Sequence, residues 1–239
     1  MPIWIGGYSD WTAACDAILT DHGIKPRWTD PTGEPEPAIG LLSGSSADWY
    51  PFLDRVLRRS RTILLGNPGS WSLHDLMALE RISDESGARV IPFRPWRELL
   101  SGSSTRQVRI HVGLSAEERW KPAFGHAVDL LVQQLGTDHL LRTDASRSPD
   151  MKAVGAQLLA QLRFQNGALA QLALERRPQS AITLATGLHS SVTTAPDMPT
   201  AMESVITALL EEQAGLPTLQ QAIAGRKIEE KIMAILRSS

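Results

Sequence analysis

The first hundred residues alternate short apolar runs with stretches of helical spacing, and this alternation constrains the fold most. The runs predicted as strands are residues 2–5, 25–30, 38–42, 62–65 and 89–93. The stretches predicted as helices, whose apolar side chains share one face, are residues 9–19, 48–58 and 72–86. Strands that alternate with helices of this length form βαβ units and build a parallel sheet. We therefore expect an α/β fold that begins with a Rossmann-like half.

The second half has a different pattern. Residues 157–164 and 169–175 alternate apolar and polar side chains and are joined through Asn166-Gly167, a strong hairpin signal for a type I′ turn. The other predicted strands are residues 107–113, 181–186 and 190–195, and the predicted helices are 117–135, 200–210 and 222–236. This pattern predicts an open, largely antiparallel sheet with helices beside it. We place a nucleotide-binding domain at residues 1–100 and a sheet domain at 105–239, whose C-terminal helices pack back on the first domain.

The composition excludes several classes of protein. A net charge of −2 over 239 residues gives no broad attraction to nucleic acid or to an anionic membrane. Cys15 is the only cysteine, so no intramolecular disulfide and no cysteine-based metal site can form, and packing in a helix explains it. The N-terminal residues lack the features of a signal peptide, and no apolar stretch is long enough for a membrane span. We expect a cytoplasmic protein.

Three motifs of the second half carry a resemblance to a known family. The first is the helical stretch from Gly125 to Leu131, in which a histidine, an aspartate and two leucines follow a glycine. The second is the hairpin 162–172, with its Phe164-Gln165-Asn166-Gly167-Ala168 turn, and the third is Gly215-Leu216-Pro217 before the last helix. These motifs, spread thinly over most of the chain, resemble the Gfo/Idh/MocA family of nicotinamide-dependent sugar and polyol oxidoreductases.

The resemblance implies NAD or NADP as cofactor, unless its site has been lost. Gly6, with Gly7 beside it, stands where the dinucleotide motif begins, and Asp30 stands where a carboxylate holds the ribose hydroxyls. The motif needs two further glycines, for close approach of the pyrophosphate and for helix packing. Tyr8 and Trp11 replace them here. The chain also lacks room for the usual helix and strand between the second strand and residue 38.

The implied catalytic site is altered as well. The family's catalytic lysine corresponds to Asn67, and the carboxylate one helical turn before the histidine corresponds to Pro122. His126 remains as an acid or base, or as an inert, partly buried helix residue. Asp129 and Arg94 remain as predicted substrate contacts. Residues that act as a unit lose most of their effect when one partner is removed.

Three functions stay open from the sequence. The chain is either a non-catalytic homologue that forms a homo-oligomer or joins a full-length homologous subunit, or an active NAD(P)-dependent oxidoreductase of a sugar-like substrate. The third function is a binding protein for another small molecule. Six of the seven tryptophans lie in the first half, among them Trp4, Trp11, Trp28, Trp49 and Trp71. Such a set fills a core, replaces a lost nucleotide or forms an interface, and core packing is favoured.

Overall fold

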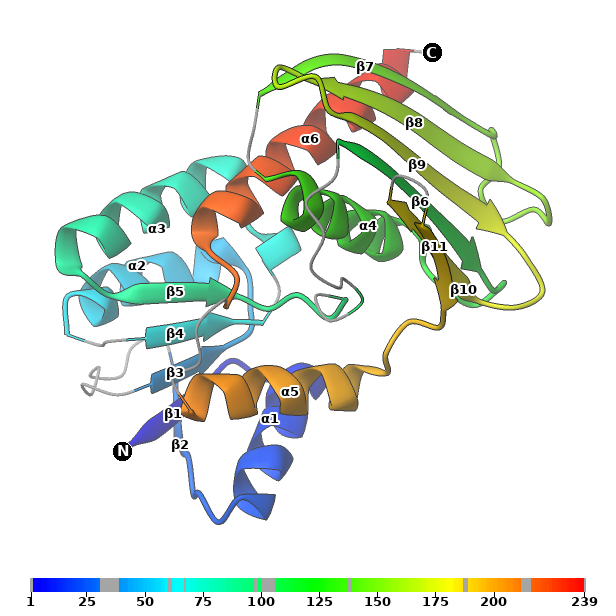
Figure 1. Cartoon of the computed structure of the whole chain (residues 1–239). Helices are drawn as coiled ribbons and strands as arrows, with labels where there is room; N and C mark the ends of the chain where they lie inside the picture. Colours follow the sequence, from blue (N-terminus) through cyan, green and yellow to red (C-terminus); the bar gives the residue numbers. More distant parts are fainter. Residues whose placement is uncertain are drawn as a thin grey trace. The chain divides into compact units, whose positions relative to one another are not determined.

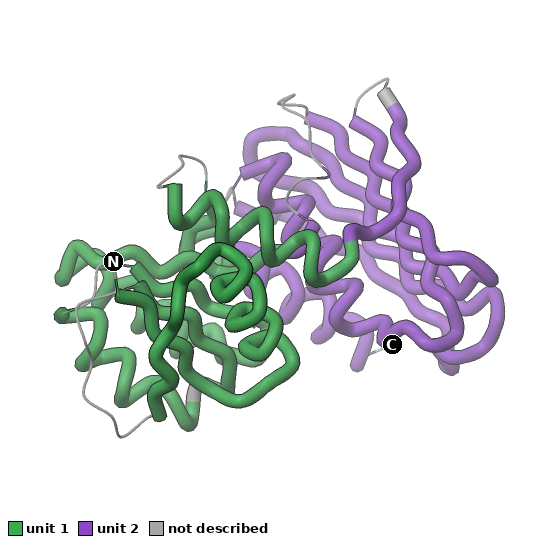
Figure 2. Tube along the Cα trace, turned by 90° about the horizontal axis from the view of Figure 1, so that it is seen from below, with its two compact units in different colours: residues 1–94, 197–223 green, residues 95–196, 224–239 purple. Residues whose placement is uncertain are grey.

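The computed structural model describes residues 2–30, 39–59, 62–66, 68–96, 99, 106–136, 139–186, 189–211 and 216–238. The chain divides into two compact units: residues 1–94 with 197–223, and residues 95–196 with 224–239 (Figure 2). The chain therefore enters the first unit twice. In the described part of the chain, no helix has both the length and the apolar character that crossing a membrane requires.

Unit 1 is built on a parallel sheet. Its strands are β1 (Ile3–Gly6), β2 (Arg27–Thr29), β3 (Ile39–Leu42), β4 (Thr62–Leu65) and β5 (Arg89–Pro92), in the order β2-β1-β3-β4-β5 (Figure 1). All four pairings are parallel. A Rossmann sheet usually has six strands in the order 3-2-1-4-5-6. The observed order corresponds to the Rossmann order with strand 3 left out. The short segment before residue 38 predicts this loss.

Helices cover both faces of this sheet. They are α1 (Asp10–Asp21), α2 (Ser46–Leu57), α3 (Leu73–Ser86) and α5 (Met198–Leu210), with a short 3-10 helix, η1, at Pro68–Ser70. One core joins α1 and α5 to the sheet through Cys15, Leu41 and Val205, and another joins α2 and α3 through Phe52 and Leu79. Burial on both faces explains why the strands read as short, continuously apolar runs.

Unit 2 contains a six-stranded sheet. Its strands are β6 (Gln107–Leu114), β7 (Leu140–Arg147), β8 (Gln157–Phe164), β9 (Leu169–Arg176), β10 (Ala181–Thr186) and β11 (His189–Thr193). Their order is β11-β10-β6-β9-β8-β7, and every pairing is antiparallel except the parallel pairing of β6 with β9. The predicted fold class, a shortened Rossmann-like sheet followed by a largely antiparallel one, is confirmed.

Helices of unit 2 cover one face of that sheet. They are α4 (Trp120–Leu135) and the part of α6 (Leu219–Ser238) that follows residue 223 (Figure 1). Their apolar residues, such as Leu131 and Ile232, share a core with alternate strand residues such as Ile110 and Leu172. The opposite face carries the remaining alternate residues, which, apart from the buried Gly113, are exposed or half-buried where the structure describes them.

The hairpin between β8 and β9 differs in its turn from the predicted type I′ form. The Gly167 N–H donates to the Phe164 carbonyl over 3.1 Å, the Phe164 N–H donates to the Ala168 carbonyl, and Gly167 has a φ of 82°. This is the pattern of a three-residue loop with a glycine bulge. The Asn166 side chain accepts from the Ala168 N–H over 2.8 Å, which holds the loop closed.

Candidate functional site

The carboxyl ends of the unit 1 strands form the position where a Rossmann sheet binds its ligand. The strand order reverses between β1 and β3, and ligands of open α/β sheets lie outside such a reversal. Gly7 follows β1 with a φ of 87°, and a Cβ placed on it would lie 1.8 Å from the Ser43 carbonyl oxygen. The predicted glycine therefore lets two strand ends touch each other.

Gly6 has a similar packing role. A Cβ on Gly6 would lie 2.9 Å from both the Leu42 and the Trp49 side chains. Trp49 also packs against Gly44, where an added Cβ would lie 2.5 Å from its indole. Gly6 and Gly7, the two glycines predicted to bind the cofactor, thus lie at the predicted end of the first strand. There they pack against other residues of the protein.

The first turn of α1 is capped by side chains at its own N-terminus. The Thr12 N–H donates to the Ser9 hydroxyl over 3.2 Å, and the Ser9 N–H donates to the Thr12 hydroxyl over 2.9 Å. This reciprocal capping box satisfies two N–H groups at the helix start. A pyrophosphate at a helix N-terminus needs such groups as donors.

Tyr8 and Trp11, the two bulky residues of the motif, point in different directions. Tyr8 is 86% exposed and stacks on Trp28 of β2 with a ring-centroid distance of 5.4 Å and an interplanar angle of 6°. Trp11 is half-buried and contacts Phe93, which follows β5, with a centroid distance of 5.8 Å. A Cβ on Gly66, which follows β4, would lie 2.6 Å from the Trp11 indole.

Trp11 therefore reaches across the carboxyl side of the sheet. Its helix follows β1, whereas Gly66 follows β4, which is two strands away in the sheet. The Trp11 Nε1 atom is buried and has no hydrogen-bond partner among the described residues. An indole that leaves its N–H unpaired is held there by packing, because burying an unpaired donor has a cost.

Two further tryptophans of unit 1, Trp4 and Trp71, are buried beside glycines in the core. Trp4 packs on Gly40, where an added Cβ would lie 2.1 Å from the indole, and Trp4 is 4% exposed. Trp71 is fully buried and donates from Nε1 to the Gly44 carbonyl over 3.1 Å. Core packing therefore explains these residues, as favoured from the sequence. Cys15 is buried in the core between α1, α5 and the sheet, and burial raises the pKa of its thiol, which makes it unreactive.

The remaining predicted site residues of unit 1 differ in exposure. Asp30 directly follows β2 and is exposed, at the strand end where the ribose-binding carboxylate was predicted. Arg94 lies two residues after β5 and is only 2% exposed. Asn67 lies outside the described residues.

In unit 2, α4 carries His126 and Asp129. His126 is half-buried, and its ring lies 5.2 Å from that of Trp96, which is 8% exposed. Pro122, one turn earlier, is exposed. A Cβ on Gly225 of α6 would lie 3.1 Å from Oδ1 of Asp129, so this carboxylate faces a neighbouring helix.

Sequence reasoning missed the most perturbed acid of unit 2, Glu229 on α6. Burial, and next the negative charge of Asp129, raise the pKa of Glu229 to about 7, although Arg226 partly offsets both. Its Oε1 atom would lie 2.6 Å from a Cβ on Gly125. The sequence does contain a signal for this pair: a carboxylate follows a glycine by four residues in both helices.

Two further polar groups of unit 2 were also missed. Arg176 is 6% exposed and donates to the Met151 carbonyl over 2.8 Å and to the Ser115 carbonyl. These bonds connect the loop between β7 and β8 to the end of β6. His111 and Glu175 lie 3.2 Å apart on the uncovered face of the sheet. A hydrogen bond from Arg177 lowers the pKa of Glu175. The described residues contain no group of three or more His, Cys, Asp or Glu side chains that could hold a metal.

Comparison with known proteins shows the fold. No family model matches the sequence, and no curated protein matches it. Scyllo-inositol dehydrogenase from Lactobacillus casei, solved with NAD(H) and scyllo-inositol, matches with a TM-score of 0.72 and 9% identity over 100% of this chain and 97% of that one. UDP-N-acetylglucosamine 3-dehydrogenase GnnA from Acidithiobacillus ferrooxidans matches with a TM-score of 0.70 and 10% identity, over 100% and 98%.

A third solved dehydrogenase extends the comparison. WlbA from Thermus thermophilus, in complex with NAD and α-ketoglutarate, matches with a TM-score of 0.65 and 12% identity over 95% of this chain and 93% of that one. The fold implied by the resemblance to Gfo/Idh/MocA oxidoreductases is therefore confirmed. Fold alone does not define function, which depends on the residues grafted onto it.

Proposed function

We propose that this chain is a non-catalytic, cytoplasmic homologue of the Gfo/Idh/MocA oxidoreductases that acts as a subunit of an oligomer. The observation that carries the proposal is the position of Trp11. Its indole packs against Gly66 and Phe93, beside the carboxyl ends of β4 and β5. A dinucleotide in the crevice of a Rossmann sheet needs that side of the sheet.

The surrounding residues support the loss of the cofactor. Gly7 brings the β1 end against the Ser43 carbonyl, and the capping box of α1 uses N–H groups that would otherwise meet a phosphate. These side chains do not fit a bound dinucleotide. Asp30 is the one predicted cofactor contact that lies exposed at a strand end.

The residues of α4 support the loss of catalysis. The family's carboxylate one helical turn before the histidine would support proton transfer by His126, and Pro122 occupies that position here. Asp129 faces Gly225 across the helix pair. His126 is in this view an inherited helix residue packed beside Trp96.

The uncovered face of the six-stranded sheet supports an oligomer made of second copies of this chain. Leu159, Leu169 and Val192 are 38%, 46% and 73% exposed on this face. One row of neighbouring residues runs from Asp144 on β7 to Arg109 on β6 through two glutamines. A copy related by a two-fold axis would place these opposite charges against each other.

Sedimentation or light scattering tests this surface. Leu169→Arg should convert the oligomer to monomers, because a buried unpaired charge opposes association. Val154→Arg is the matched control, since Val154 is 88% exposed in a loop outside the sheet strands. A monomeric wild-type protein that co-purifies with a larger homologue would favour a partner subunit instead.

Titration with NADH and NADPH tests the loss of the cofactor. Trp4, Trp11 and Trp28 would transfer energy to a bound nicotinamide, so binding would be seen as quenching of tryptophan fluorescence. The proposal expects no saturable quenching at cofactor concentrations up to the millimolar range, and no polyol oxidation. Saturable binding with turnover that His126→Ala abolishes would overturn it.

The second candidate is an active NAD(P)-dependent oxidoreductase of a sugar-like or other small hydroxylated substrate. Its support is the fold shared with dehydrogenases solved with NAD(H) or NAD. In that case His126 is the acid or base, Asp129 and Arg94 contact the substrate with Asn67, and Gly6, Gly7 and Asp30 hold the cofactor. The titration above separates the two candidates.

A further inference from the structure

The uncovered face of the unit 2 sheet carries more positive than negative charge. Residues that alternate with the buried ones along each strand share this face. The ionised side chains of its strands are Arg109, Arg142, Asp144, Arg163 and Glu175. Arg177, which directly follows β9, reaches Glu175 with its guanidinium. In the described part of the chain, this face therefore has four arginines for two carboxylates.

The two carboxylates each bind an arginine of the same chain. The Arg142 Nε atom lies 2.9 Å from Oδ2 of Asp144, and the Arg177 Nη2 atom lies 2.6 Å from Oε2 of Glu175. These pairs neutralise one another on the face. Two of its four arginines are left over.

Arg163, on β8, is one of the two arginines left over, and Arg109 is the other. Arg163 lies directly opposite Arg142 on β7 and directly opposite Leu169 on β9. Like charges directly opposite each other destabilise a sheet. Among the residues that the structure describes, Arg163 forms no ion pair and no side-chain hydrogen bond. It is thus an exposed cation between a second cation and an apolar side chain.

The two-fold contact between copies of this chain determines what Arg163 would face. When Asp144 of one copy faces Arg109 of the other, the axis runs parallel to the strands, between β8 and β9. Each cross-strand row then faces the same row of the second copy. Leu169 lies beside Arg163 in its row, so it faces Arg163 of the second copy. The two Arg163 side chains therefore lie next to each other, one on each side of the axis.

We propose that this contact, which rests on the proposed function, encloses an oxyanion of the phosphate class between the two Arg163 side chains. Two cations that leave water together need a counter-charge, because a buried unpaired charge opposes association. Each guanidinium presents parallel N–H donors that match two oxygens of an oxyanion. A tetrahedral phosphate or sulfate has enough oxygens to meet one guanidinium on each side, whereas a planar carboxylate does not.

The enclosed anion makes assembly depend on phosphate. A ligand that binds the associated form but not the separate copies shifts the equilibrium by mass action. One anion is held for every two chains, so the association constant rises in proportion to the anion concentration once the site begins to fill. The uncovered sheet face is then both the contact between copies and the site at which phosphate regulates that contact.

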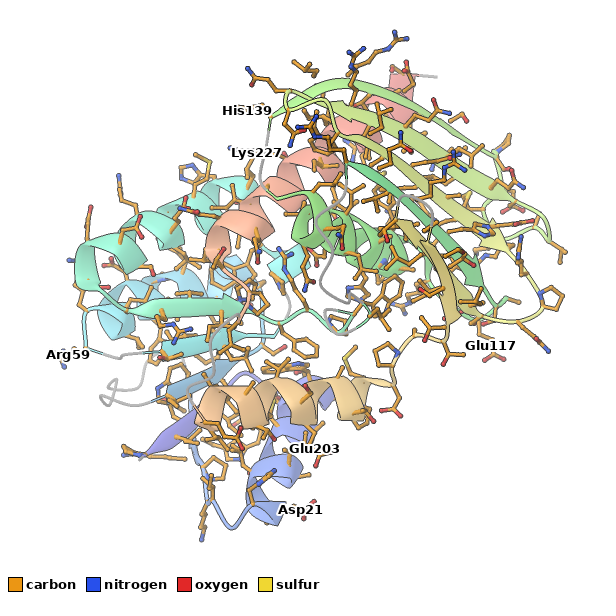
Figure 3. All side chains as sticks on the ribbon, viewed as in Figure 1. Asp21, Arg59, Glu117, His139, Glu203 and Lys227 are labelled. Carbon is orange, nitrogen blue, oxygen red and sulfur yellow. The ribbon has the colours of Figure 1, made fainter. Side chains whose placement is uncertain are left out.

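Sedimentation equilibrium tests the site in buffers in which phosphate replaces chloride at constant ionic strength, which holds the screening of charges fixed. The association constant of the wild type should rise up to about tenfold for each tenfold increase in phosphate. Arg163→Gln removes both the repulsion and the donors for the anion, so it should associate equally in the two buffers. Arg59→Gln, which removes an exposed arginine of unit 1 just after α2 (Figure 3), is the matched control and should keep the wild-type response.

Calorimetric titration with inorganic phosphate should give one site for every two chains. Glycerol phosphate should not replace it, and equal promotion by this ester would overturn an enclosed site. An oligomer with the same association constant in phosphate and in chloride would overturn the anion site and leave the proposed oligomer intact, as would a wild-type response in Arg163→Gln. A chain that stays monomeric in both buffers would contradict the proposed oligomer itself, and the anion site with it.

Discussion

The two sheets of this chain differ in how their faces are covered. The parallel sheet of unit 1 is covered by helices on both faces, and tryptophans of the same unit fill the space beside Gly6, Gly40, Gly44 and Gly66. The mixed sheet of unit 2 is covered on one face only and exposes leucines and a valine on the other. The first sheet is thus covered on both faces by helices of its own unit, whereas the second leaves apolar side chains exposed on one face.

The largest expected contrast comes from removing one side chain from each sheet. Trp49→Ala should lower the free energy of unfolding by about 3–5 kcal/mol, because Trp49 is buried and fills the space over Gly6 and Gly44. Val192→Ala should change it by less than about 0.5 kcal/mol in the monomer, because Val192 is exposed. Urea unfolding measures both. Equal losses would mean that unit 1 does not depend on its tryptophan packing.

Close backbone approach in unit 1 gives the next effect. Gly7→Ala should lower the free energy of unfolding by about 2–5 kcal/mol, since positive φ and the contact with the Ser43 carbonyl both oppose a Cβ. Gly23→Ala is the control, because Gly23 has a φ of 72° but no neighbour within 4 Å of an added Cβ. That control should lose only about 1 kcal/mol. Equal losses in the two variants would show that the strand ends can separate.

The sequence predicted most of the fold, because its strongest patterns have local causes. Ser9 and Ser72 cap α1 and α3 next to the predicted starts, and Gly87 ends α3 in the left-handed conformation that glycine favours. Strand β7 was missed because residues 140–147 form an exposed edge without clear alternation. The parallel pairing of β6 with β9 was missed because the pairing of distant strands leaves no local pattern.

The candidate site was less predictable. The replacement of glycines by Tyr8 and Trp11 was visible, but the direction of each side chain depends on partners that follow other strands. Trp11 packs on Gly66, fifty-five residues later in the sequence. Glu229 was missed because its burial against Gly125 is a property of the helix crossing, and no sequence window contains both residues.

A pH dependence of stability should belong to unit 2. The pKa of Glu229 is about 7 in the folded chain, against an ordinary value of 4.5, so the folded state binds more protons between these values. The free energy of unfolding should therefore fall by about 3 kcal/mol as the pH rises from 4.5 to 7, and level off above. Urea unfolding of the wild type and Glu229→Gln at several pH values measures this. An identical slope in both proteins would place the effect elsewhere.

The smallest effect concerns how the helices of the two units begin. The Ser72 hydroxyl accepts from the Asp75 N–H over 3.1 Å, so Ser72→Ala should lower the free energy of unfolding by about 1 kcal/mol. Helix α4 of unit 2 begins after Arg119, which has extended backbone angles and makes no side-chain cap bond. Arg119→Ser should therefore raise the free energy of unfolding by about 0.5–1 kcal/mol. Thermal unfolding of both variants tests these two predictions. The two changes in the free energy of unfolding must have opposite signs.

The most direct measurement of the central claim is NADH binding to Trp11→Gly beside the wild type, followed by the emission of the nicotinamide. This substitution returns a glycine to the third position of the dinucleotide motif and removes the indole that packs on Gly66. If Trp11 closes the crevice, Trp11→Gly should show saturable NADH binding, while the wild type shows none up to millimolar cofactor. Saturable micromolar binding to the wild type, unchanged in Trp11→Gly, would contradict the account.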